Sequence, residues 1–220
     1  MSQTIPPVID KAISRLLFDH PFFATLALST PVVMSERIPI AATDGRQILF
    51  NPGWVAENDK VADVNTVLVH EVGHNAFMHH TRREWRDPEI WGMAADYEIN
   101  SVLKEQGFRP PPCGWLQDDR FNEMSAEKIY EELMKNPPPP MPGGGGDGEP
   151  QDGSEPGARY PMSGDLVEGP GSSDPAEMTT LRREQRQRVA TAAAQAKMMG
   201  KLNGSLAALI DDLVQPKVPW

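Results

Sequence analysis

The sequence has only one cysteine, Cys113, in 220 residues, so no disulfide can form within the chain and a reducing compartment suits it. It contains no apolar run near the roughly 20 residues that span a bilayer. The N-terminus has no basic leader followed by an unbroken apolar core, so it is not typical of a secretory signal peptide. These absences predict a cytoplasmic protein with no membrane association.

Apolar residues are also scarce, at 39%, and the net charge of −10 is unevenly placed. Residues 136–178 hold eight acids, one base, ten prolines and ten glycines. A segment of this composition cannot offset its ordering entropy by burial, which predicts a disordered acidic Pro/Gly-rich linker. The negative charge disfavours nucleic acid as a partner. We therefore predict a folded core at 1–135, a linker at 136–178, and C-terminal helices at 179–220 that pack on the core.

Hydrophobic spacing predicts an α+β fold that is mainly helical, with a small antiparallel or mixed sheet. Short β-rich runs occupy residues 31–36 (PVVMSE) and 47–50 (QILF), and Asp44-Gly45 between them favours a hairpin turn. Helices are expected at 8–18, 21–29, 63–83, 88–104, 125–134, 180–199 and 205–214.

Four of the five histidines lie within the eleven residues from His70 to His80. His70-Glu71-Val72-Gly73-His74 has the form HExxH, and two histidines four apart on a helix share one face and can bind one tetrahedral Zn²⁺. The glutamate between them is placed to take a proton from a water molecule as that water attacks a carbonyl. The pattern predicts catalysis by a metal site with three protein ligands.

The third ligand is less directly indicated. His80 follows His74 by six residues, the spacing of the longer metzincin pattern, but Phe77 stands where that pattern has a turn-forming glycine. On a continuous helix His80 would lie about 9 Å farther along the axis than His74. We therefore expect His79 and His80 to pack, face solvent or support the ligands from outside.

An acid on the helix expected at 88–104 is the better candidate. Asp96 and Glu98 point about 200° apart around a helix, so only one of them can face the metal. Small residues beside Asp96 would allow the close helix approach that its short side chain needs. Asn100, one turn later, would then orient the Asp96 carboxylate.

Three blocks carry a resemblance to a known family: HEVGHNAFMHHTRR, DPEIWGMAADYEIN and DDRFNEMSAEKIYEEL. They resemble the metallopeptidase domain at the N-terminus of bacterial VWA-like proteins, over most of residues 5–135 and again over 180–220. The resemblance implies a zincin-like fold, gives the third-ligand role to Asp96, and suggests a MoxR-type AAA+ ATPase encoded nearby. Trp220 lies where the VWA domain would begin, as expected of a truncated or a stand-alone form.

We therefore predict a zinc-dependent metallopeptidase acting on a protein or peptide, with His70, His74 and Asp96 as Zn²⁺ ligands and Glu71 as general base. An extended peptide would align on an edge strand, at 31–36 or 47–50. The acidic linker would act as a lid or pro-like segment.

The alternative is a non-catalytic adaptor whose zinc stabilises a module that docks a AAA+ ATPase or a VWA-domain protein. Glu71 argues against it, because a structural site needs no base. HExxH alone also leaves open hydrolysis of a non-peptide bond.

Overall fold

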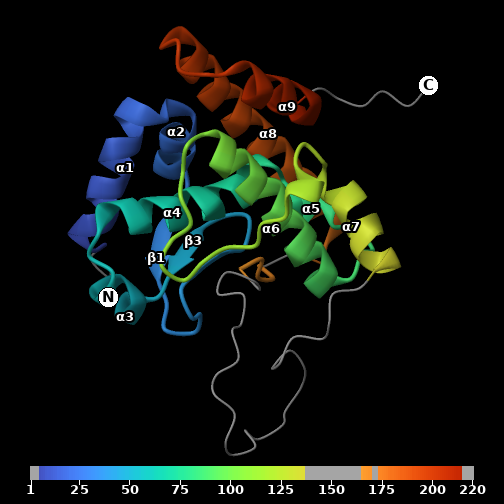
Figure 1. Ribbon diagram of the computed structural model, residues 1–220, viewed down its shortest axis with the longest axis horizontal. Coiled ribbons are helices and arrows are strands. Elements are labelled where there is room, and N and C mark those ends of the chain that lie inside the picture. Colours follow the sequence, from blue (N-terminus) through green and yellow to red (C-terminus); the bar gives the residue numbers. More distant parts are fainter. Residues whose placement is uncertain (1–4, 137–164, 170–172, 215–220) are drawn as a thin grey trace, which may run out of the picture.

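The computed structural model describes residues 5–136, 165–169 and 173–214, and Figure 1 shows their arrangement. The predicted α+β class, mainly helical with a small mixed sheet, is confirmed. Within the described ranges no helix has both the length and the apolar character needed to cross a membrane. The helices are α1 (Pro7–Asp19), α2 (Pro21–Ser29), α3 (Pro52–Glu57), α4 (Val61–Ala76), α5 (His79–Arg82), α6 (Pro88–Glu105), α7 (Ala126–Lys135), α8 (Pro175–Met198) and α9 (Gly204–Val214), with a 3₁₀ turn at Asp119–Phe121.

The sheet has three short strands, β1 (Val32–Met34), β2 (Ala41–Thr43) and β3 (Ile48–Phe50), in the order β1-β3-β2. β1 pairs with β3 in parallel, and β2 pairs with β3 antiparallel. The Asp44 carboxylate accepts the backbone N–H groups of Arg46 and Gln47, while Gly45 takes a φ of +85°, so the expected turn closes a β2–β3 hairpin.

The sheet order corrects one expectation about the edges. The run at 47–50 forms β3, which is central and has both sides paired, so it cannot align a peptide. Of the two edge strands, β2 is the one with the larger packing contact with α4, and it was not recognised from the sequence as a separate strand. β2 was missed because Ala41-Ala42-Thr43 is too short and too weakly β-forming to stand out.

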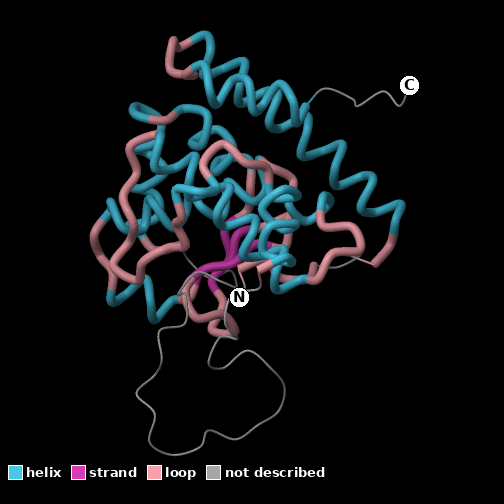
Figure 2. Tube along the Cα trace, turned by 45° about the vertical axis from the view of Figure 1, so that its right-hand side comes forward, coloured by secondary structure: helices cyan, strands magenta, loops and turns pink. Residues whose placement is uncertain are grey.

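Helix α4 forms the centre of the molecule, and its residues from Val64 to Ala76 are all buried. The strands lie against it, and α1, α2, α6 and α8 pack around it (Figures 1 and 2). Gly73 allows the approach of α6, because a Cβ there would lie 3.1 Å from Ile99 Cγ2. The HExxH segment is therefore held in the interior, next to the helix that carries Asp96.

The start of α6 is set by its capping residue. The Asp87 carboxylate accepts the N–H groups of Glu89 and Ile90, and Pro88 occupies the first helical position. This cap fixes where the helix begins and therefore which way Asp96 points.

Helix α8 crosses the molecule from the β2–β3 turn to α2. Gln185 donates to the Gly45 carbonyl at 3.2 Å, and Thr25 of α2 donates to Gln195 at 3.2 Å. Val189, Ala192 and Ala196 belong to the main core, where their small side chains permit close helix packing. Helix α9 and the C-terminal part of α8 lie at the end of the molecule away from the strands (Figure 1).

The long helix expected at 63–83 is interrupted, which corrects the prediction that it continues past Phe77. α4 ends at Ala76, and Met78 adopts a left-handed conformation with a φ of 57° before α5 begins. This conformation is costly for a residue other than glycine, and a sequence pattern does not indicate it. It is maintained here by tertiary contacts: Met78 is buried, and Trp91 Nε1 donates to the His79 carbonyl at 3.0 Å.

Candidate metal centre

Three predicted site residues lie together between α4 and α6. His70 and His74 are one turn apart on α4, and their Nε2 atoms are 3.1 Å from each other. Asp96 Oδ1 lies 3.5 Å from His70 Nε2 and 3.4 Å from His74 Nε2. Of the two candidate acids on α6, Asp96 therefore faces the histidines, and Glu98 points elsewhere.

A fourth donor comes from a residue that the sequence interpretation placed in the acidic linker. Asp165 Oδ2 lies 2.8 Å from His70 Nε2 and 3.4 Å from His74 Nε2. Donor atoms of His70, His74, Asp96 and Asp165 all lie within 4.8 Å of one another, and all four residues are buried. The only local sign in the sequence is the apolar pair Leu166-Val167, in a stretch that is otherwise poor in apolar residues.

The residues present fit a divalent metal ion. Both Asp96 oxygens and Asp165 Oδ1 are buried without a hydrogen-bond partner among the described residues, as are both Glu71 oxygens. Burying carboxylate oxygens that have no hydrogen bond is costly unless a cation compensates them. Two imidazole nitrogens and two carboxylate oxygens at this spacing suit Zn²⁺.

The electrostatics of the cluster also favour a cation. Burial alone lowers the pKa of His74, but the Asp165 and Asp96 carboxylates outweigh it and raise that pKa to about 9. The pKa of His70 is raised for the same reason. Despite burial, His74 and His70 hold the pKa of the Asp165 carboxyl well below its usual range. The carboxylates thus attract positive charge, which either protons on the imidazoles or a metal ion can supply.

Glu71 is the fully buried carboxyl next to this cluster in the chain. Burial, followed by repulsion from Asp165, raises the pKa of Glu71 well above its ordinary value, although the two histidines oppose the rise. Its two oxygens are buried without a hydrogen-bond partner among the described residues, and the charges of the four clustered residues act on this carboxyl.

A family model described as a putative metallopeptidase domain matches residues 6–220. The chain belongs to this family. Comparisons with curated proteins and with solved structures gave no match. The match agrees with the resemblance seen in the sequence and spans both sides of the acidic segment.

In this metallopeptidase-family chain, Asn100 supports His70. Asn100 donates from its amide nitrogen to the Leu116 carbonyl at 2.9 Å, so its oxygen accepts from His70 Nδ1 at 2.9 Å. His70 Nε2 is then left with a lone pair for a metal. The expectation that Asn100 orients Asp96 was wrong, because the Asn100 side chain contacts His70 on α4 instead.

His79 supports His74 in the same way. Its Nε2 donates to Glu98 Oε2 at 2.8 Å, and its Nδ1 lies 3.1 Å from His74 Nδ1. Burial lowers the pKa of His79 to about 3, so the ring is neutral and its Nδ1 accepts from His74. The left-handed Met78 turns His79 back towards α4, which explains how a residue five positions after His74 reaches it. His80 donates instead to the Thr43 carbonyl at 3.0 Å.

Replacing His79 with phenylalanine is expected to weaken zinc binding by about 10–100-fold, because the hydrogen bond that orients His74 is lost. Chelator competition measures this affinity. The neighbouring His80→Phe change, which touches no candidate ligand, is the matched control. Unfolding of the metal-free proteins, measured in parallel, separates weaker metal binding from a damaged fold. Equal zinc affinity in His79→Phe and wild type would contradict the role.

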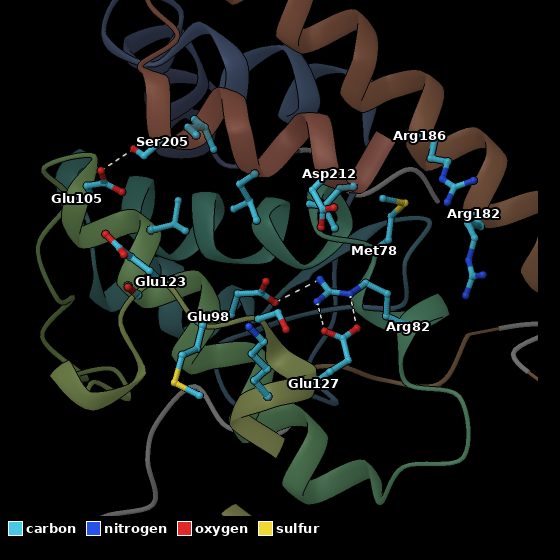
Figure 3. Close-up of a pocket in the computed structure, with 18 of the residues that line it drawn as sticks. Met78, Arg82, Glu98, Glu105, Glu123, Glu127, Arg182, Arg186, Ser205 and Asp212 are labelled. Carbon is cyan, nitrogen blue, oxygen red and sulfur yellow. Dashed lines mark hydrogen bonds and ion pairs between the residues drawn. The ribbon is translucent and has the colours of Figure 1, made fainter. Parts of the chain in front are cut away.

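Glu98, which accepts a hydrogen bond from His79, also lines a groove on the surface. Arg82 contacts Glu98 at 3.2 Å and Glu127 at 2.7 Å. Burial alone would raise the pKa of Glu98, but Arg82 and His79 outweigh it and lower that pKa. Arg82, Glu98 and Glu127 line a groove of about 740 Å³, which Arg182 and Arg186 of α8 also line (Figure 3). None of the four candidate ligands lines this groove, so it is separate from the metal centre.

Proposed function

We propose that the protein is a zinc-dependent metallopeptidase in which His70, His74 and Asp96 hold the metal. The observation that carries this proposal is the buried Glu71 carboxylate, which has no hydrogen-bond partner among the described residues and adjoins the donor cluster. A purely structural metal site has no need for such a group. A zinc ion bound there would supply Lewis acidity, which activates water and polarises a carbonyl.

The protein groups have distinct roles in this proposal. Glu71 takes a proton from the attacking water and passes it to the leaving amine, and burial raises the pKa of this carboxyl. Asn100 and His79 hold the two ligand imidazoles with their Nε2 atoms directed at the metal position. Burial around them excludes bulk water, which strengthens each electrostatic contact.

The proposed substrate is an extended peptide, bound along the outer edge of β2. Strand addition needs unpaired backbone groups beside the catalytic residues, and Thr43 of β2 lies close to Asp165 and hence to the cluster. A cytoplasmic location and a MoxR-type AAA+ ATPase or VWA-domain partner stay predictions from composition and resemblance.

A non-catalytic adaptor is the second candidate, and one observation favours it. The cluster has four protein donors, and structural zinc sites usually fill all four positions with protein ligands. In this alternative zinc stabilises a docking module and Glu71 has no chemical role.

Metal removal tests the proposed function. Stripping the protein with 1,10-phenanthroline is expected to abolish cleavage of a peptide library, and adding zinc back is expected to restore it. Mass spectrometry of the peptides detects cleavage, and elemental analysis measures the bound metal. If the zinc-loaded protein cleaves no peptide, both as wild type and with Asp165 replaced by alanine, the peptidase proposal fails.

A further inference from the structure

We propose that residues 165–169, called here the strap, act as an intramolecular inhibitor that occupies the peptide-binding edge and completes the metal site. The chain would therefore fold as a latent enzyme. This inference rests on the proposed function, because it assigns a regulatory occupant to the same site. Figure 1 shows the strap as a short orange segment beside the strands, far in sequence from the helices it meets.

The strap binds β2 as a short added strand. Thr43 N–H donates to the Asp165 carbonyl at 2.8 Å, and Val167 N–H donates to the Thr43 carbonyl at 3.0 Å. Leu166 forms a parallel bridge with Thr43. Both outward backbone groups of Thr43 are therefore in use, and a peptide that needs them must displace the strap.

The same segment places a carboxylate where a catalytic site keeps a free position. Catalytic zinc sites have three protein ligands and one open position, whereas the strap adds Asp165 to His70, His74 and Asp96. All four residues are buried, with Asp165 only 3% exposed. With the strap in place, protein donors can fill all four positions of a tetrahedral zinc site.

The remaining contacts of the strap lie at its periphery. Glu168 pairs with Arg83 at 2.6 Å, but the Glu168 side chain is 56% exposed, so this pair contributes little. Leu166 and Val167 are only partly buried and line a cavity of about 170 Å³ beside His79 and His80. Gly169 lies close to Asp44, where a Cβ would come within 3.0 Å of the Asp44 backbone.

This distribution distinguishes the strap from a core strand. Its backbone pairing is confined to one residue of β2. Its two apolar side chains border a cavity, and only Leu166 also packs against a hydrophobic cluster, where it stays partly buried. Asp165 supplies the buried polar contact with the metal centre. Removing that carboxylate should release the segment while the three ligands on α4 and α6 keep their positions.

Asp165→Ala tests the inference through a readout that is independent of peptide cleavage. Cobalt(II) replaces zinc as a coloured probe, and acetohydroxamate is titrated into the cobalt-loaded protein while its visible spectrum is followed. Apparent affinity falls with the fraction of molecules that can bind, so the wild type should bind the probe about tenfold or more weakly than Asp165→Ala. Peptide cleavage should rise by a similar factor.

Two further variants make the test specific. Val167→Pro removes the N–H that pairs with Thr43 but leaves Asp165 intact, and it should also tighten hydroxamate binding and raise cleavage. Glu177→Ala removes an exposed acid that pairs with an arginine outside the strap, and it should match the wild type.

The outcomes separate this inference from the proposed function. Tighter hydroxamate binding with retained metal but no cleavage supports the strap and overturns the peptidase proposal. Cleavage with unchanged hydroxamate affinity in Asp165→Ala and Val167→Pro overturns the strap alone. Loss of metal from Asp165→Ala also overturns the strap, because Asp165 would then be a permanent ligand, as the adaptor alternative requires.

Discussion

Replacing Glu71 with glutamine is expected to lower peptide hydrolysis by about 10²–10⁴-fold, the usual contribution of a general base. Zinc content should not change, because Glu71 is not one of the four clustered donors. Glutamine has nearly the same shape and cannot ionise, so it avoids burying a carboxylate at a position whose oxygens have no partner among the described side chains. We therefore expect thermal unfolding at the same temperature as wild type or slightly above it.

Peptide hydrolysis should be measured for two pairs of proteins. One pair is the wild type and Glu71→Gln, and the other is Asp165→Ala with and without Glu71→Gln. The double variant matters because the strap would limit the activity of the wild type. Elemental analysis of each protein confirms equal metal loading. Full turnover by a zinc-loaded Glu71→Gln protein would exclude Glu71 as the base, and with it the proposed mechanism.

Replacing Asp96 with alanine is expected to remove the metal. The carboxylate contacts both ligand histidines, and its loss leaves two imidazoles and Asp165. The wild-type protein should also become more stable on adding zinc, by about 4 kcal/mol at a free concentration 1,000 times the dissociation constant. Asp96→Ala should lose most of this increment, which thermal unfolding with and without zinc measures within each protein.

Ser101→Ala is the control for this experiment. Ser101 lies on the same helix and contacts Asn122 at an exposed position, away from the cluster. It should retain both zinc and the zinc-dependent increase in stability. If Asp96→Ala keeps full zinc while His80→Ala loses it, the assignment of the third ligand is wrong.

Local patterns predicted the parts of this site that depend on one helix. The spacing of His70, Glu71 and His74 requires only that the segment be helical, and α4 is helical there. Choosing Asp96 over Glu98 required the orientation of one helix against another, and phase along α6 did not decide it. The resemblance favoured Asp96, and the packing of α6 on α4 through Gly73 places that side chain beside the histidines.

The features that sequence reasoning missed depend on contacts between distant segments. Asp165 lies 95 residues from His70, in a stretch whose overall composition predicts disorder. Met78 adopts a conformation that usually belongs to glycine, so the pattern suggested a continuous helix, and support of a ligand was only one of three roles expected of His79. Asn100 was associated with its neighbour on α6 although its partner is on α4. In each case tertiary packing outweighed the local preference.

The chain of contacts from His74 through His79, Glu98 and Arg82 ends at the wall of the 740 Å³ groove. Metal binding and groove binding are therefore open to thermodynamic linkage. Suppose that a molecule binds against Arg82 and changes the zinc affinity by some factor. Zinc must then change the affinity of the protein for that molecule by the same factor. A titration of zinc would thus report on an occupant of the groove without any assay of catalysis.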